Sequence, residues 1–215
     1  MRINQFIALA TGMSRRAADK VIADGRIYVN GSIGRTGQQI LDSDKVTLDN
    51  KPIAVSKTAT IILNKPVGYV CSRAGQGSQT IYDLLPAKLH SLKAVGRLDK
   101  DSSGLILLTN DGQLAHTLTH PSFQKEKVYE VELNKPLRPQ DKLKIEQGIR
   151  LEDGISKLKL SSIEQSTYEV RMHEGRNRQI RRTFAAVAYK VIKLNRTQFG
   201  DHKLDKLQSG KFLQI

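Results

Sequence analysis

One short stretch is the starting point for predicting the fold of this chain: Gly96-Arg97-Leu98-Asp99-Lys100-Asp101-Ser102-Ser103-Gly104. It lies between two apolar runs, residues 92–95 and 105–108. An apolar run, a short polar segment and a second apolar run predict a strand, a tight loop and a strand. A loop between two buried strands holds its side chains rigidly. This loop therefore presents Asp99 as a candidate reactive carboxylate.

The overall charge indicates the kind of partner. The chain has 215 residues, with 35 Lys and Arg against 21 Asp and Glu, which gives a net charge of +14. Such an excess predicts a polyanionic partner, most simply nucleic acid. Aromatic residues make up 5% of the chain and Trp is absent, which argues against an open platform that stacks many single-stranded bases.

Cysteine and histidine content argues against metal and disulfide chemistry. Cys71 is the only cysteine, so we expect neither a disulfide framework nor a zinc cluster. His116 and His120 are four residues apart without an evident third ligand, so no metal site is expected. No apolar run is long enough to span a bilayer, and the first residues contain no signal-peptide core. These features predict a cytoplasmic protein.

The first fifty residues form a distinct predicted domain. Ile3, Phe6, Ile7 and Ala10 recur at helical spacing, and Gly12 ends this helix. A second helix begins at the Ser14 cap and is followed by strands at 26–29 and 46–48. Residues 51–58 are polar, contain a proline and are interpreted as a linker. The remaining residues, 59–215, form the second predicted domain.

The second domain is predicted to be α+β. Its strands follow one another too closely for a crossover helix to join every pair, which favours a mixed, mainly antiparallel sheet with helices packed on it. The expected strands are 60–63, 93–98, 105–109, 128–133, 158–163, 168–173 and 191–194. The expected helices are 113–118, 140–147 and 178–188.

Two clusters of basic residues predict contacts with phosphate. Ser14-Arg15-Arg16 places two arginines at a helix start, where the helix dipole disfavours cations, so an anionic partner is expected there. Glu174-Gly175-Arg176-Asn177-Arg178-Gln179-Ile180-Arg181-Arg182 is denser still, and its arginines require either RNA phosphates or a buried carboxylate among them. The residues expected to bind RNA are Arg2, Arg15, Arg16, Lys20, Arg26, Arg176 and Arg178.

A loop aspartate by itself is more often a turn former than a nucleophile. Three segments in order change that interpretation: residues 96–105, Glu126-Lys127-Val128-Tyr129, and residues 174–182. Together they resemble the three main motifs of the RsuA-type pseudouridine synthases, which modify ribosomal RNA. Ile62-Leu63-Asn64-Lys65-Pro66-Val67-Gly68-Tyr69 resembles the strand that opens that family's catalytic domain. The resemblance covers the whole chain and implies a pseudouridine synthase catalytic domain.

The resemblance implies roles for particular residues. Asp99 matches the family's essential aspartate, which attacks the uridine at the ribose or the base or assists a glycal-like intermediate. Tyr129 matches the tyrosine that stacks on the target base. Arg181 matches the arginine that pairs with the aspartate, with Arg182 as the neighbouring alternative.

Two further residues complete the implied base pocket. Arg97 matches a residue beside the flipped nucleotide, and Ile180 would line the pocket. No cofactor is implied, because the reaction oxidises nothing and adds no group. Extruding the uridine from its stack costs free energy that the basic surfaces would offset through phosphate contacts.

The first domain resembles the small S4-like RNA-binding domain. The matching stretches are Arg2-Ile3-Asn4-Gln5-Phe6-Ile7-Ala8, Ser14-Arg15-Arg16-Ala17-Ala18 and Gly25-Arg26-Ile27-Tyr28-Val29-Asn30-Gly31. This resemblance implies that the domain reads folded RNA through shape and phosphates. The sequence thus predicts a monomeric enzyme for a uridine of ribosomal RNA, with 23S favoured over 16S. The alternatives are a non-catalytic RNA-binding or ribosome-assembly factor and a hydrolase of a nucleoside bond.

Overall fold

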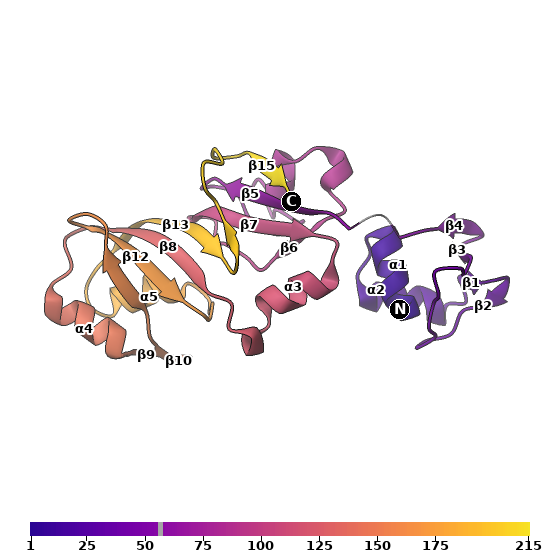
Figure 1. Ribbon diagram of the computed structural model, residues 1–215, viewed down its shortest axis with the longest axis horizontal. Helices are drawn as coiled ribbons and strands as arrows, with labels where there is room; N and C mark the ends of the chain where they lie inside the picture. The colour runs from indigo at the N-terminus through magenta and orange to yellow at the C-terminus, as the bar shows by residue number, and fades with distance from the viewer. Residues whose placement is uncertain (56–57) are drawn as a thin grey trace. The chain divides into compact units, whose positions relative to one another are not determined.

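The computed structural model describes residues 1–55 and 58–215. The chain divides into two compact units, Met1–Ala59 and Thr60–Ile215 (Figure 1). Residues 56–57 of the predicted linker lie outside the described residues. Within the described ranges, no helix has the length and apolar character needed to cross a membrane.

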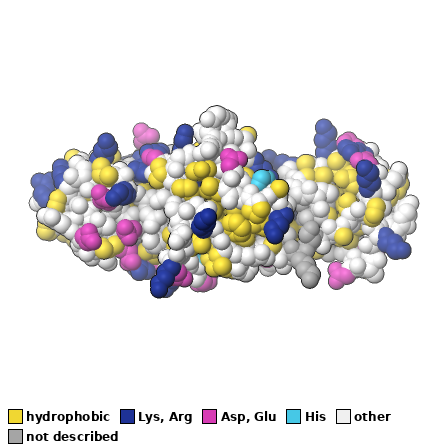
Figure 2. All heavy atoms as spheres, turned by 90° about the horizontal axis from the view of Figure 1, so that it is seen from above, with side chains coloured by type: hydrophobic (Ala, Val, Ile, Leu, Met, Phe, Trp, Pro, Cys, Tyr) yellow, Lys and Arg dark blue, Asp and Glu magenta, His cyan; other side chains and the backbone are white. Residues whose placement is uncertain are grey.

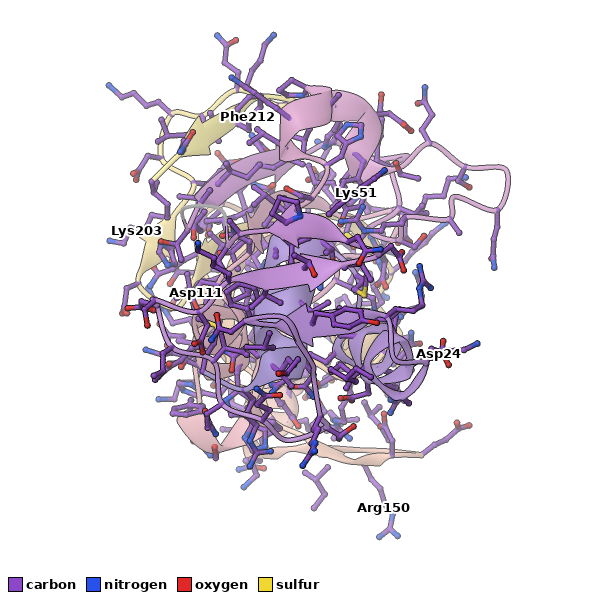
Figure 3. All side chains as sticks on the ribbon, turned by 90° about the vertical axis from the view of Figure 1, so that its right-hand side faces the viewer. Asp24, Lys51, Asp111, Arg150, Lys203 and Phe212 are labelled. Atoms are coloured by element: carbon purple, nitrogen blue, oxygen red, sulfur yellow. The ribbon has the colours of Figure 1, made fainter. Side chains whose placement is uncertain are left out.

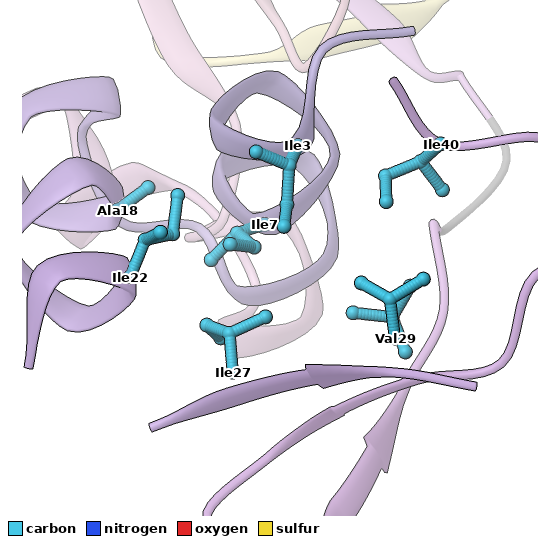
Figure 4. Close-up of a cluster of buried hydrophobic side chains, with 8 residues drawn as sticks. Ile3, Ile7, Ala18, Ile22, Ile27, Val29 and Ile40 are labelled. Atoms are coloured by element: carbon cyan, nitrogen blue, oxygen red, sulfur yellow. The ribbon is translucent and has the colours of Figure 1, made fainter. Parts of the chain in front are cut away.

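The first unit packs two helices on a four-stranded sheet of order β2-β1-β3-β4. Gly12, with φ of 77°, ends α1, and the Ser14 side chain accepts a hydrogen bond from the Ala17 N–H at the start of α2. Isoleucines from both helices and from the sheet form the core (Figure 4). The elements are α1 Ile3–Thr11, α2 Arg15–Ala23, β1 Ile27–Val29, β2 Ser32–Ile33, β3 Val46–Leu48 and β4 Lys51–Ile53.

The predicted linker begins too early, because Lys51–Ile53 is a strand of the first unit. It pairs antiparallel with β3, with Val46 opposite Ile53. Asp49 and Asn50 both have positive φ, 49° and 63°, which is the geometry of a tight hairpin turn. Pro52 is tolerated because β4 lies at the edge of the sheet.

The second unit is built on one large sheet of order β11-β12-β8-β13-β7-β5-β15, with β14 paired to β13 and β6 to β7. The β13–β7 pair is parallel and its neighbours are antiparallel, so the predicted mixed, mainly antiparallel sheet is confirmed. The strands are β5 Thr60–Lys65, β6 Lys93–Val95, β7 Ser103–Thr109, β8 Lys127–Leu133, β11 Lys159–Ser162, β12 Thr167–Met172, β13 Val191–Phe199, β14 His202–Lys203 and β15 Phe212–Gln214.

Strand β7 can lie in the interior of this sheet because its sequence, Ser-Gly-Leu-Ile-Leu-Leu-Thr, is apolar on both faces. Leu105, Ile106, Leu107 and Leu108 are all fully buried. The α-helices of this unit are α3 Gly112–Thr119, α4 Pro139–Gln147 and α5 Gln179–Ala185, and short 3₁₀ turns occur at Ile81–Leu84, Ala87–Leu89 and Pro121–Phe123. The predicted helices at 113–118 and 140–147 are thereby confirmed to within one residue at each end.

Two of the differences from prediction lie where the backbone adopts positive φ, whereas α5 ends at Ala185, before the predicted residue 188, and β13 continues to Phe199, beyond the predicted residue 194. β6 stops at Val95 because Gly96 has φ of 74°, so the predicted strand 93–98 is too long. Helix α5 begins at Gln179 because Arg178 is left-handed, with φ of 46°. The hairpin of β9, Ile149–Leu151, and β10, Gly154–Ser156, was not predicted.

Candidate active site

One pocket of the second unit, about 970 Å³ in volume, collects most of the predicted site residues. Its walls come from the loop after β6, from β8, from the segment between β12 and α5, and from β13. The predicted residues that line it are Arg97, Asp99, Tyr129, Arg176, Arg178 and Ile180. The structure therefore brings together residues that lie up to 83 positions apart, from Arg97 to Ile180.

Asp99 stands at the pocket wall with its side chain 34% exposed. Oδ2 of Asp99 lies 3.7 Å from Nη1 of Arg178. The same guanidinium donates to both oxygens of Asp101, at 2.9 Å each. That pair holds the pKa of Asp101 below its ordinary value, against the opposing effect of burial. A permanently charged arginine thus stands beside the candidate nucleophile.

Arg181 lies differently from the prediction. Its Nε is 3.3 Å from Asp101, its Nη2 donates to the Asp101 carbonyl and its Nη1 donates to the carbonyl of Val191. These contacts tie α5 to the loop and to β13. The structure does not bring Arg181 into an ion pair with Asp99. The arginine nearest to that carboxylate is instead Arg178, whose backbone is left-handed. Asp101 thus contacts both Arg178 and Arg181.

Arg176 and Arg182 share another carboxylate. Both guanidinium groups bind Asp153, which lies between β9 and β10. Arg182 also donates to the carbonyl of Asn177 and is not among the residues that line the pocket. The structure therefore does not place Arg182 at the base pocket. Figure 3 shows a contrasting case, Arg150 of β9, whose side chain extends from the surface.

Tyr129 of β8 is 7% exposed and lines the pocket beside residues that the sequence did not single out. Arg196 of β13 lies opposite Tyr129 in the sheet and is 2% exposed. Lys127 lies nearby, where burial and the charge of Arg196 lower the pKa of its ammonium. The guanidinium carbon of Arg196 is 4.8 Å from the ring centre of Phe199.

A half-buried thiol contacts the loop that carries Asp99, and a buried lysine lies near it. The Cys71 thiol donates to the Leu98 carbonyl and accepts from the Leu98 N–H, both at 3.3 Å. Burial raises the pKa of this thiol. Lys65 is fully buried and donates to the Pro66 carbonyl at 3.0 Å. Desolvation lowers the pKa of Lys65, while Cys71, Asp101 and Asp99 act in the opposite direction.

The predicted cations of the first unit are exposed. Arg15 and Arg16 occupy the first turn of α2, and Lys20 lies in its last turn. Arg26 forms a two-point ion pair with Asp49, so its guanidinium already has a partner. Figure 2 shows that Lys and Arg side chains are spread over the face in view, with acidic side chains between them.

Sequence reasoning missed Arg196, Lys127 and Lys65 as pocket or loop supports. The signal that could have found Arg196 is a lone arginine in an otherwise alternating strand, Val-Ile-Lys-Leu-Asn-Arg-Thr-Gln-Phe. Across residues 1–55 and 58–215, no three His, Cys, Asp or Glu side chains are grouped as a metal site would need.

Comparisons with known proteins agree with the fold. A family model described as RNA pseudouridylate synthase matches residues 59–186. This match and the full-length relatives place the chain among the RNA-modifying enzymes, and it belongs to the RNA pseudouridylate synthase family.

Full-length relatives include proteins named for both ribosomal subunits. The chain is 35% identical to ribosomal large subunit pseudouridine synthase B of Bacillus subtilis, covering 97% of this chain and 89% of the relative. It is 36% identical to ribosomal small subunit pseudouridine synthase A of Pasteurella multocida, covering 100% and 96%. A solved structure of a pseudouridylate synthase superposes with a TM-score of 0.72 at 33% identity, covering 100% of this chain and 96% of that one.

Proposed function

We propose that this enzyme isomerises one specific uridine of ribosomal RNA to pseudouridine, with Asp99 as the essential carboxylate. The observation that carries the proposal is the shared pocket of Asp99 and Tyr129, with Arg178 3.7 Å from the carboxylate. The names of the full-length relatives support ribosomal RNA as the substrate. The enzyme acts as a monomer in the cytoplasm.

The uridine enters the pocket by leaving its stack, because a stacked base hides its glycosidic bond. Tyr129 stacks on the flipped base, Ile180 forms an apolar wall and Arg97 occupies the space that the base vacates. The uracil is detached at N1, turned and rejoined to C1′ through C5. Atoms are conserved in this isomerisation, so no cofactor is required. Arg15, Arg16 and the other exposed cations of the S4-like first unit hold the RNA through its phosphates.

Site mapping on ribosomal RNA tests the proposal. Unmodified 16S and 23S transcripts are incubated with wild-type protein, with Asp99→Asn and with Asp201→Asn, and pseudouridine is mapped by carbodiimide-dependent primer extension. Asp201 is the matched control, since its side chain is 92% exposed and belongs to the same unit. We expect one new stop with wild type and Asp201→Asn and none with Asp99→Asn.

The transcript that carries the stop identifies the ribosomal subunit. An RNA that binds wild-type protein yet gains no stop would indicate a non-catalytic RNA-binding factor. Release of free uracil would indicate a hydrolase. Either result overturns the proposal.

A further inference from the structure

Among the described residues, three that line the pocket have a buried polar atom without a hydrogen-bond partner: Arg196, Ser102 and Arg176, whose Nε does lie 3.3 Å from the carboxylate of Glu174. For Arg196 and Ser102 these atoms are Nη2 and Oγ. Arg196 is 2% exposed and Ser102 is 1% exposed, and both residues line the pocket. Unpaired buried polar groups are costly, and charged groups are the most costly of all. A ligand atom in the pocket is the partner that these groups lack.

The sheet places Arg196 between the two segments that carry the chemistry. On one side Arg196 lies opposite Tyr129 of β8, and on the other it lies opposite Gly104, where the Asp99 loop enters β7. Directly opposed residues of antiparallel strands point to the same face, so Arg196 shares the face of Tyr129. Nε donates to the Leu105 carbonyl at 2.8 Å, which fixes the plane of the guanidinium. Nη2 has no hydrogen-bond partner, although neighbouring atoms cover it in the unliganded pocket.

The chemistry of Arg196 selects its partner. A guanidinium carries a permanent charge and only donates hydrogen bonds, so it requires an oxygen or nitrogen acceptor. Phosphates suit the exposed arginines of the rim, such as Arg97 and Arg178. Arg196 is instead enclosed, next to the ring of Phe199 and on the face of Tyr129. A buried guanidinium beside aromatic rings suits the edge of a planar base.

We propose that Arg196 is a further catalytic residue, whose Nη2 donates to a carbonyl oxygen of the flipped uracil and stabilises the negative charge of the detached ring. This inference rests on the proposed function and names the group that recognises its substrate. The Ser102 hydroxyl accepts from the N3–H of the same ring. Cytosine carries an amino group in place of O4 and has no N3–H, so an arginine that donates to O4 and a hydroxyl that accepts from N3–H both select against cytosine.

The charge arises in a balanced step. The C1′–N1 bond breaks with both electrons on N1, and that charge spreads to the two ring carbonyl oxygens. Asp99 compensates at the ribose, either by bonding to C1′ or by taking the C2′ proton. C5 then bonds to C1′ and Asp99 is regenerated. C5 loses its proton and N1 gains one, so no oxidant or reductant takes part. A fixed cation in an enclosed site stabilises the intermediate charge without reorganisation.

The test compares Arg196→Gln and Arg196→Lys with wild type in single-turnover reactions at saturating RNA. The substrate is a fragment around the mapped site with either uridine or 5-fluorouridine at that position. Fluorine withdraws electrons and makes the detached ring a more stable anion. On uridine we expect Arg196→Gln to react about 100-fold more slowly, the range for loss of one such donor. On the second substrate, the rate is measured from the disappearance of 5-fluorouridine in nuclease digests of the RNA. There we expect the rate deficit of Arg196→Gln to be at least tenfold smaller than on uridine.

Controls separate this effect from folding and from RNA binding. Arg171→Gln removes a comparable charge from β12, outside the pocket, and is expected to react within about twofold of wild type. Arg196→Lys keeps a cation and gives an intermediate deficit, and it carries the test if Arg196→Gln does not fold. Filter binding is expected to show unchanged affinity for the uridine fragment.

Three results would overturn the inference. These are an equal deficit on both substrates, no deficit, or a loss of RNA affinity that matches the loss of rate, which would assign Arg196 to a phosphate. If wild-type protein itself forms no pseudouridine, the proposed function fails first. The two failures are therefore distinguishable.

Discussion

The guanidinium of Arg178 binds both carboxylate oxygens of Asp101 and lies 3.7 Å from Asp99. Two acidic residues of one loop therefore share one arginine, which begins helix α5 from a left-handed backbone conformation. The position of Asp99 depends on α5 through this arginine, although the two lie far apart in the sequence. Substitution of Arg178 should therefore affect the reaction rate, whereas substitution of Asp101 or of Gly104, where the loop enters β7, should affect the stability of the fold.

Replacing Arg178 with Met should slow the reaction by about tenfold or more, because Asp99 loses its nearby cation. The measurement is single-turnover formation of pseudouridine at saturating RNA, so weaker RNA binding does not contribute. The matched control is Arg182→Met, since Arg182 binds Asp153 and does not line the pocket. Equal losses in both variants would show that removal of any α5 charge explains the effect.

Replacing Asp101 with Asn should lower the free energy of unfolding by about 1 kcal/mol near pH 7, a value reduced for the 46% exposure of this side chain. The fold depresses the pKa of Asp101, chiefly through Arg178, so its contribution is complete above the unfolded-state value and is lost as pH falls below it.

Urea unfolding measured from pH 7 down to pH 3.5 checks this sign. The difference in free energy of unfolding between wild type and the Asp101→Asn variant should become smaller at acid pH. A difference that stays constant would show that the charge of the carboxylate is not responsible for the lost stability.

Replacing Gly104 with Ala should destabilise the protein by about 2 kcal/mol or more. A Cβ there would lie 2.3 Å from the backbone oxygen of Arg196, and φ is 105°. Gly112→Ala is the control, because a Cβ at that position meets nothing within 4 Å and lies in α3. Thermal unfolding of both variants gives the comparison. A stable Gly104→Ala protein would contradict the close approach of β7 and β13.

Replacing both Arg15 and Arg16 with Ala should weaken binding of ribosomal RNA and reduce the slope of log affinity against log salt by about one to two units. Chemistry at saturating RNA should persist, since neither residue belongs to the pocket. Lys206→Ala with Lys211→Ala removes the same net charge from exposed positions of the second unit. A slope that is unchanged in the arginine variant, or equally reduced in both, would remove the role assigned to α2.

Local sequence patterns predicted much of the fold. The apolar run at 105–108 identified β7 because both faces of that strand are buried, and Gly12 and Ser14 marked the ends of the first two helices through their cap geometry. The resemblance named Asp99 and Tyr129, and the structure places both at one pocket.

Long-range pairing could not be predicted in the same way. The position of Arg196 opposite Tyr129 depends on the order of strands in the sheet, which no local pattern encodes. The choice between Arg178 and Arg181 as neighbour of Asp99 depends on the left-handed conformation of Arg178, which a non-glycine residue adopts only rarely. The β9–β10 hairpin is short and its pattern is weak, and its importance comes from long-range contacts, those of Asp153 with Arg176 and Arg182 and those of Ser156 with Gln179 and Thr183.

Strand β13 holds the large sheet together as one piece. It is the strand that joins β8 to β7, so the two parts of the large sheet share no direct pairing without it. Tyr129 lies on β8, in one part, and the loop of Asp99 leads into β7, in the other. Local opening of Val191–Phe199 would therefore separate the carboxylate from the tyrosine and dismantle the pocket, even where each part of the sheet kept its own hydrogen bonds.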